Sequence, residues 1–165
     1  MKILRSVFLL LLFVFITGCS SNAKETEDLK WFNSEEKAKE YGLKHENIKE
    51  NDVLEMTDLN NERLVIYKFK VPEGEGINVA QIVKKNKKYS WHTISNRIVV
   101  KSGQEKIGNM VINVKVESEK GHVFKLYSGV VDDPKNPDIA IREEESVTPT
   151  IVQETGMYYA IKSLK

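Results

Sequence analysis

RLVIYKFKV, residues 63–71, is the stretch that decides the fold class of this chain. Successive side chains of a β-strand point to opposite faces, so one face collects the apolar residues Val65, Tyr67, Phe69 and Val71. The alternation therefore predicts a strand with a continuous apolar face. Residues 72–76 (PEGEG) end this strand, because glycine permits the positive φ that tight turns need.

Short strands are expected on both sides of this stretch. Before it, residues 53–57 lead to a turn signal at Asn60-Asn61. After it, residues 77–84 and 89–94 predict a hairpin joined at Asn86-Lys87. Alternation predicts a further strand through Met110, Ile112, Val114 and Val116. The remaining strands are expected at residues 122–131, 138–142, 147–152 and 157–161.

One helix is predicted ahead of the strands, over residues 33–42. Asn33 or Ser34 can cap its first turn, and Glu36 occupies the capping-box position relative to Asn33. Gly42 is a natural C-terminal stop. Because the segment has few apolar residues, we expect a short helix lying on a sheet edge.

These elements predict a mainly β (α+β) protein with about eight or nine short strands. Turns every 8–12 residues and the lack of long helical crossovers favour an antiparallel β-sandwich or open barrel over a parallel α/β sheet. We expect a single globular domain over residues 31–165.

The N-terminal residues have the composition of an export signal. Lys2 and Arg5 form a basic start, and residues 7–16 are almost entirely apolar but too few to span a ~30 Å hydrocarbon core comfortably. The segment Ile16-Thr17-Gly18-Cys19 follows. It resembles a bacterial lipobox, which is an aliphatic residue and two small residues before an obligatory cysteine.

The lipobox resemblance implies a diacylglycerol on the sulfur of Cys19 and cleavage just before it. Cys19 is the only cysteine of the chain, so no disulfide competes for it. We expect a signal peptide over residues 1–18, a lipidated flexible tether over 19–30, and anchoring to the extracytoplasmic face of a cell membrane. Two acyl chains hold a protein on a membrane stably, whereas one does so only marginally.

A second resemblance concerns the mature chain. Residues 31–38 (WFNSEEKA) with Tyr41-Gly42, and residues 127–134 (YSGVVDDP), resemble segments of small lipoproteins of Gram-positive spore-forming bacteria. These motifs are not catalytic, so the resemblance implies a location rather than an activity.

Nucleic acid is not an expected partner. Cleavage before Cys19 would remove two of the 25 basic residues and none of the 24 acidic ones, leaving a net charge of −1. A nearly neutral chain has no field that favours a polyanion.

The sequence contains no catalytic constellation, and we expect no cofactor and no metal site. His45, His92 and His122 lack the close spacing of a metal site, although ligands assembled across strands stay open. Ser90 and His92 are interpreted as ordinary strand residues rather than a nucleophile and its base. Asp132, Asp133 and Asp138 could offer oxygens to calcium, but the Asp-Pro and Asn-Pro pairs favour a turn.

The run Lys84-Lys85-Asn86-Lys87-Lys88 is the strongest charge feature, placed at the expected hairpin tip. Either Lys84, Lys85, Lys87 and Lys88 keep an exposed turn soluble, or they contact anionic headgroups or wall polymers. The acidic run Glu143-Glu144-Glu145 predicts a solvated turn. The aromatic residues Tyr89, Trp91, Tyr158 and Tyr159 are expected in the core rather than in a ligand groove.

The function that these features favour is that of a membrane-anchored, non-enzymatic binding or interaction module. Its partner is expected to be an envelope protein or an anionic wall or membrane surface. Two alternatives stay open: a hydrolase or transferase with a site assembled from distant residues, and a carrier of a small apolar ligand. A pocket with converging polar groups would favour the enzyme, and an apolar cavity would favour the carrier.

Overall fold

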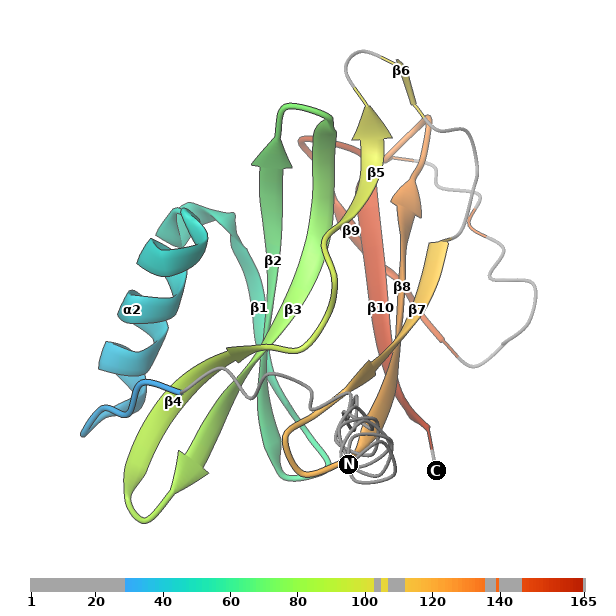
Figure 1. Ribbon diagram of the computed structural model, residues 1–165. Coiled ribbons are helices and arrows are strands. Elements are labelled where there is room, and N and C mark those ends of the chain that lie inside the picture. Colours follow the sequence, from blue (N-terminus) through green and yellow to red (C-terminus); the bar gives the residue numbers. More distant parts are fainter. Residues whose placement is uncertain (1–28, 103–104, 107–111, 136–138, 140–146, 165) are drawn as a thin grey trace, which may run out of the picture.

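The described part of the chain forms two antiparallel sheets and one α-helix (Figure 1). Figure 1 is a computed structural model, in which residues 29–102, 105–106, 112–135, 139 and 147–164 are described. Of the two architectures that the sequence left open, the structure adopts the sandwich, because its strands divide between two separate sheets. The prediction of a mainly β fold with one helix is confirmed.

The first sheet is built around the long strand β3 (Gly74–Lys85). On one side β3 pairs with β2 (Glu62–Val71), which in turn pairs with β1 (Val53–Leu59). On its other side β3 is long enough for two partners. Its first residues pair with β5 (Ile98–Ser102) and its last six with β4 (Lys88–Thr93), so the β3–β4 hairpin projects beyond the rest of the sheet (Figure 1). The short β6 (Glu105–Lys106) pairs with β5.

The second sheet has the order β7-β8-β10-β9. It contains β7 (Ile112–Glu117), β8 (Val123–Val130), β9 (Thr150–Val152) and β10 (Met157–Leu164). Strands β8 and β10 pair along their whole length, from Val123 with Leu164 to Val130 with Met157.

Strand β2 is buried on both faces, which the alternation alone did not reveal. Val65, Tyr67 and Phe69 share one face, as predicted, and are buried beneath the helix. Leu64 and Ile66 point the other way and are equally buried, between the two sheets. Burying a large apolar side chain contributes ~1.5–3 kcal/mol, so both faces of this sheet must be covered.

Two apolar clusters result, one on each face of the first sheet. The inter-sheet core includes Leu64, Ile66, Ile77, Val79, Phe124, Leu126, Met157 and Tyr159. The helix-side core contains Ala38, Leu43, Val65, Tyr67, Phe69, Ala80, Ile82 and Trp91. The molecule therefore has three layers, namely a helix, the first sheet and the second sheet.

Helix α2 (Glu35–Glu46) begins where the sequence predicted but ends four residues later. Ser34 is the N-cap, and its side chain accepts a hydrogen bond from the backbone N–H of Lys37. Gly42 was expected to end the helix and does not. Instead Asn47 adopts the left-handed conformation, and the N–H groups of Asn47 and Ile48 donate to the carbonyls of Lys44 and Leu43, respectively. A short 3₁₀ turn, η1 (Glu50–Asp52), then leads into β1.

Gly42 has a packing role instead of a terminating one. Helix α2 packs mainly against β4. Within the sheet, β4 is an edge strand that pairs only with β3. A Cβ on Gly42 would lie 2.0 Å from Cδ2 of Trp91, which is only 7 % exposed. The missing side chain therefore allows the helix to approach the indole ring closely.

Two predicted hairpin turns are confirmed. Asn60 and Asn61 both have positive φ, as do Asn86 and Lys87, which is the pattern of type I′ turns. Asparagine tolerates this conformation better than most residues, so the asparagines carried the turn signal.

Some strand predictions differ from the structure. Strands β5 and β6 were not predicted, although Ile98-Val99-Val100 is a β-branched run. The strand expected at residues 147–152 forms only over β9. The strand expected at 138–142 lies outside the described residues except for Ile139, as do the start of the strand expected at Met110 and the acidic run 143–145.

The two sheets are also joined by a hydrogen bond. The Tyr159 hydroxyl donates to Oε2 of Glu55 at 2.9 Å, which links β10 to β1. Burial raises the pKa of Tyr159 to about 12, and the Glu55 carboxylate adds to the rise. Tyr159 therefore remains a hydrogen-bond donor at neutral pH.

The close packing at Gly42 predicts the effect of adding one methyl group there. Gly42→Ala should lower the free energy of unfolding by about 1–3 kcal/mol, because overpacking against Trp91 outweighs the ~1 kcal/mol that alanine contributes in a helix. Urea unfolding followed by circular dichroism measures the change.

Lys37→Ala, an exposed change on the same helix, is the control and should stay within about 0.5 kcal/mol of the wild type. Combining Gly42→Ala with Trp91→Leu should cost less than the two single changes together, since the smaller side chain makes room. A Gly42→Ala variant more stable than the wild type would contradict the close approach.

Candidate functional site

The predicted lysine cluster lies at the tip of the β3–β4 hairpin. Lys84, Lys85, Lys87 and Lys88 are all exposed, and Asn86-Lys87 forms the turn. Nζ of Lys84 lies 5.4 Å from the centroid of the Tyr89 ring. In the described part of the chain these four lysines form no ion pair.

The first described residues run beside this hairpin. The backbone N–H of Phe32 donates to the carbonyl of Tyr89 at 2.7 Å, and the Tyr89 N–H donates to the Phe32 carbonyl at 2.9 Å. The Ser90 hydroxyl donates to the carbonyl of Lys30 at 2.9 Å. The chain therefore enters the domain along β4, next to the lysine cluster.

Cys19 lies outside the described residues, as does the tether up to residue 28. Lipidation of Cys19 stays a prediction. Within the described ranges, no helix is long and apolar enough to span a membrane.

The histidines do not converge on a common centre. His45 stacks on Tyr41 with ring centroids 5.7 Å apart. Nδ1 of His92 lies 3.3 Å from Oε2 of Glu119, and Nδ1 of His122 lies 2.9 Å from Oε1 of Glu62. Each of the last two pairs joins the β7–β8 turn region to the first sheet.

Ser90 and His92 are not paired with each other. The Ser90 hydroxyl is buried and donates to Lys30, while His92 faces Glu119. The structure therefore gives each of them a local partner of its own.

The aspartate loop forms a turn over its described part. Oδ1 of Asp133 accepts the backbone N–H of Lys135 at 2.9 Å, which is an Asx-turn contact. Asp138 lies outside the described residues. Among the residues described, no three His, Cys, Asp or Glu side chains are grouped so as to hold a metal ion.

The aromatic residues are core residues, as predicted. Trp91, Tyr158 and Tyr159 are buried, and Tyr89 is half-buried beside the helix-side core. Tyr89 also lines a recess of about 220 Å³ beside the hairpin.

A cleft of about 800 Å³ lies at the other end of the domain, where α2 meets the turn between β2 and β3. Its walls come from the last turn of α2, the η1 segment, the adjoining ends of β2 and β3, and the β9–β10 turn. The residues that line it are Glu40, Leu43, Lys44, Asn47, Ile48, Lys49, Glu50, Asp52, Lys68, Phe69, Lys70, Glu75, Thr155 and Met157.

Charges of both signs surround an apolar floor in this cleft. Leu43, Phe69 and Met157 are buried and contribute the floor. Lys68 pairs with Asp52 at 3.5 Å, and Lys70 pairs with Glu75 at 2.5 Å.

Other rim charges lack such partners. Glu40, Lys44 and Lys49 are exposed and form no ion pair with any residue that the structure describes. Groups of this kind can bind a polar partner without first breaking a contact in the domain.

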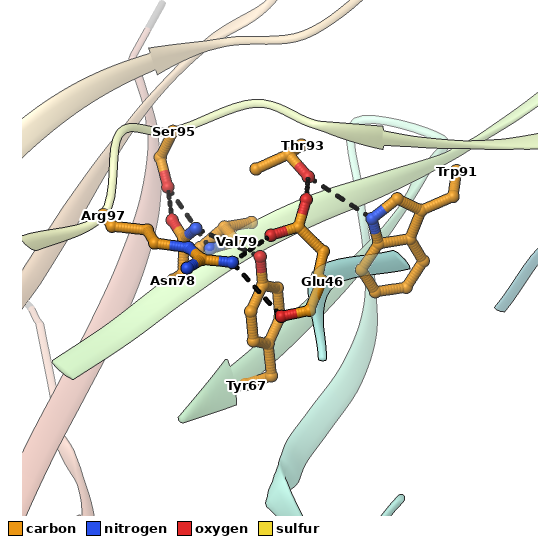
Figure 2. A network of polar contacts seen from close by, with 8 residues as sticks. All are labelled: Glu46, Tyr67, Asn78, Val79, Trp91, Thr93, Ser95 and Arg97. Carbon is orange, nitrogen blue, oxygen red and sulfur yellow. Dashed lines mark hydrogen bonds and ion pairs between the residues drawn. The ribbon is translucent and has the colours of Figure 1, made fainter. Parts of the chain in front are cut away.

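A polar network ties the last turn of α2, next to the cleft, to the first sheet and the loop after β4 (Figure 2). Glu46, in the last turn of α2, is the central residue, and its side chain is only 14 % exposed. Its carboxylate accepts the Thr93 hydroxyl at 2.7 Å and Nη2 of Arg97 at 2.8 Å. Arg97 also donates to the Glu46 backbone carbonyl at 3.2 Å, which satisfies an end carbonyl of the helix.

The network continues into the sheet. Thr93 accepts a hydrogen bond from the indole N–H of Trp91 at 3.3 Å. Nδ2 of Asn78 donates to the Tyr67 hydroxyl at 3.0 Å, and the Ser95 hydroxyl donates to Oδ1 of Asn78 (Figure 2). The pKa of Tyr67 is raised above its usual value, mainly by burial and secondly by the negative charge of the nearby Glu46.

Arg97 connects this network to the cleft floor. Its guanidinium carbon lies 5.6 Å from the centroid of the Phe69 ring, and Phe69 lines the cleft. Sequence reasoning missed both Glu46 and Arg97, because they are 51 positions apart in the chain and no local pattern marks the pair.

The network predicts that removing the charge of Glu46 destabilises the fold. Glu46→Gln should lower the free energy of unfolding by about 1 kcal/mol, because the exposed Arg97 guanidinium loses the charge of its half-buried partner. Urea unfolding measures the difference.

Glu40→Gln makes the same chemical change at an exposed position of the same helix and should have little effect. If the two variants lost the same stability, the Glu46 network would not hold the helix end.

Comparison with models of protein families, with curated proteins and with solved structures gave no match.

Proposed function

We propose that this chain is an extracytoplasmic lipoprotein, anchored through lipid on Cys19, whose domain is a non-enzymatic binding module. The observation that carries the anchor is the segment Ile16-Thr17-Gly18-Cys19 directly after an apolar run of signal-peptide length. The observation that carries the binding role is the open cleft between α2 and the first sheet.

The chemistry of the cleft supports a polar partner, such as a segment of an envelope protein. Its rim carries both basic and acidic groups, and apolar side chains line the space between them. A peptide can meet such a surface with charged side chains at the rim and one apolar side chain on the floor. A carrier of an apolar ligand would instead need an apolar cavity.

The contacts of the potential catalytic side chains also support a binding role. Ser90, His92 and His122 have structural partners and lie away from the cleft. Several charged groups that line the cleft are already paired within the domain: Glu50 with Lys39, Asp52 with Lys68, and Glu75 with Lys70.

The anchor predicts a specific modification. Mass spectrometry of the protein extracted with detergent from a Gram-positive host should show a diacylglycerol adduct on an N-terminal Cys19. Cys19→Ala should abolish the adduct and leave the leader uncleaved, since the sulfur is the acceptor.

Ser20→Ala, next to the modified residue, is the matched control and should keep both the lipid and the membrane location. A wild-type protein released without lipid, or one retained with its leader, would contradict the anchor.

The cleft predicts a contact that can be trapped in cells. A photo-crosslinking amino acid at Ile48, inside the cleft, should give a discrete adduct in the envelope. The same group at Lys115, an exposed position on β7, should not. Equal labelling at the two positions, or none at Ile48, would contradict the cleft as the binding surface.

A further inference from the structure

We propose that the tip of the β3–β4 hairpin and Trp31 form a docking surface for anionic lipid headgroups, which orients the domain on its membrane. This inference rests on the proposed anchor and adds the surface that faces the lipid. It chooses between the two interpretations of the lysine run that the sequence left open.

The charge of the tip is the first argument. Four lysines stand at the end of β3, at the start of β4 and in the turn between them: Lys84, Lys85, Lys87 and Lys88. All four are exposed, and none forms an ion pair with a residue that the structure describes. Lys120, from the β7–β8 turn, lines the same recess of about 220 Å³ as Lys84. The charges therefore gather at one end of the molecule.

Nearby acids offset only part of this charge. Glu35 and Asp58 line the same recess and share one cation, Arg63, at 3.3 and 3.2 Å, so these three groups leave one negative charge beside the lysines. Glu62 is buried against His122. Free lysine ammonium groups at an exposed tip suit the negative surface potential of a membrane with anionic lipids.

Trp31 is the second argument. The residue is 36 % exposed, and among the described residues no other large apolar side chain is exposed. Phe32 pairs with Tyr89 and packs on the helix side, so alternation directs Trp31 to the opposite face, which is also the face of Lys85 and Lys88. Tryptophan beside lysine is the combination that favours the membrane–water interface.

The position of the anchor is the third argument. Ten residues lie between Cys19 and Lys30, and even a fully extended chain of that length spans less than ~40 Å. Lys30 lies beside β4 and is hydrogen-bonded to Ser90. The chain between the lipid and the domain therefore ends next to the lysine tip.

Docking at the tip would point the cleft away from the membrane. Strand β3 starts at Gly74, next to the cleft residue Glu75, and ends at Lys85 in the tip. Ten residues of strand extend by roughly 30 Å, and Figure 1 shows the two ends of β3 at opposite ends of the first sheet. The lipid-facing surface and the binding cleft thus occupy separate ends of the domain.

Fluorescence of the lipidated protein in vesicles tests this surface. The chain has two tryptophans, and Trp91 is buried, so quenching by lipids with spin-labelled headgroups reports on Trp31. In vesicles containing phosphatidylglycerol we expect strong quenching, lost in Trp31→Phe. In pure phosphatidylcholine vesicles, or at about 0.5 M salt where charges are screened, quenching should fall.

Replacing the four tip lysines by glutamine should lower the ratio of docked to undocked domain at least ~10-fold. The matched control replaces four exposed lysines elsewhere, Lys44, Lys49, Lys115 and Lys135, and should leave quenching unchanged. If the two four-residue variants behaved alike, or if phosphatidylglycerol vesicles gave no quenching of the wild type, the docking surface would be overturned.

Flotation of the same vesicles reports separately on the anchor. Protein that floats with phosphatidylcholine is anchored by its lipid, so a missing Trp31 signal in phosphatidylglycerol would then reject only the docking surface. Protein that fails to float with phosphatidylcholine would reject the anchor, and quenching on addition of phosphatidylglycerol vesicles would still decide the docking surface.

Discussion

The burial of both faces of β2 and β3 is the constraint on which the rest of the structure depends. Leu64 and Ile66 need the second sheet, whereas Val65, Tyr67 and Phe69 need a different cover. A sheet of this composition cannot expose either face to water without losing most of its stabilisation. Helix α2 is therefore required, even though its own sequence has few apolar residues.

Because α2 has so few apolar residues, its position depends on close contact and on polar bonds at its end. Gly42 admits the Trp91 ring, and Glu46 ties the last turn to Thr93 and Arg97. The cleft follows from this arrangement. The helix end, held above the turn between β2 and β3, leaves a space that neither the helix nor the sheets fill.

Local patterns predicted the local features of the fold. Alternation in residues 63–71 and the asparagine turns identified β2 and two hairpins correctly. The helix end predicted at Gly42 was wrong. A glycine that allows another side chain to approach a helix closely cannot be told, from sequence alone, from a glycine that ends the helix. The Glu46–Arg97 pair and the cleft depend on segments about 50 residues apart, which no spacing rule connects. The lysine tip was placed correctly, but its position next to Lys30 required the structure.

The pairing of Phe32 with Tyr89 also limits edge-to-edge association between copies of the protein. The outer edge of β4 presents N–H and C=O groups that, left unpaired, could recruit a strand from another molecule. The two main-chain hydrogen bonds between Phe32 and Tyr89 occupy this edge near the start of β4, close to where the chain enters the domain. If the chain is anchored as proposed, its copies share the plane of a membrane and meet one another far more often than they would in solution. A segment that blocks edge-to-edge aggregation is most useful there.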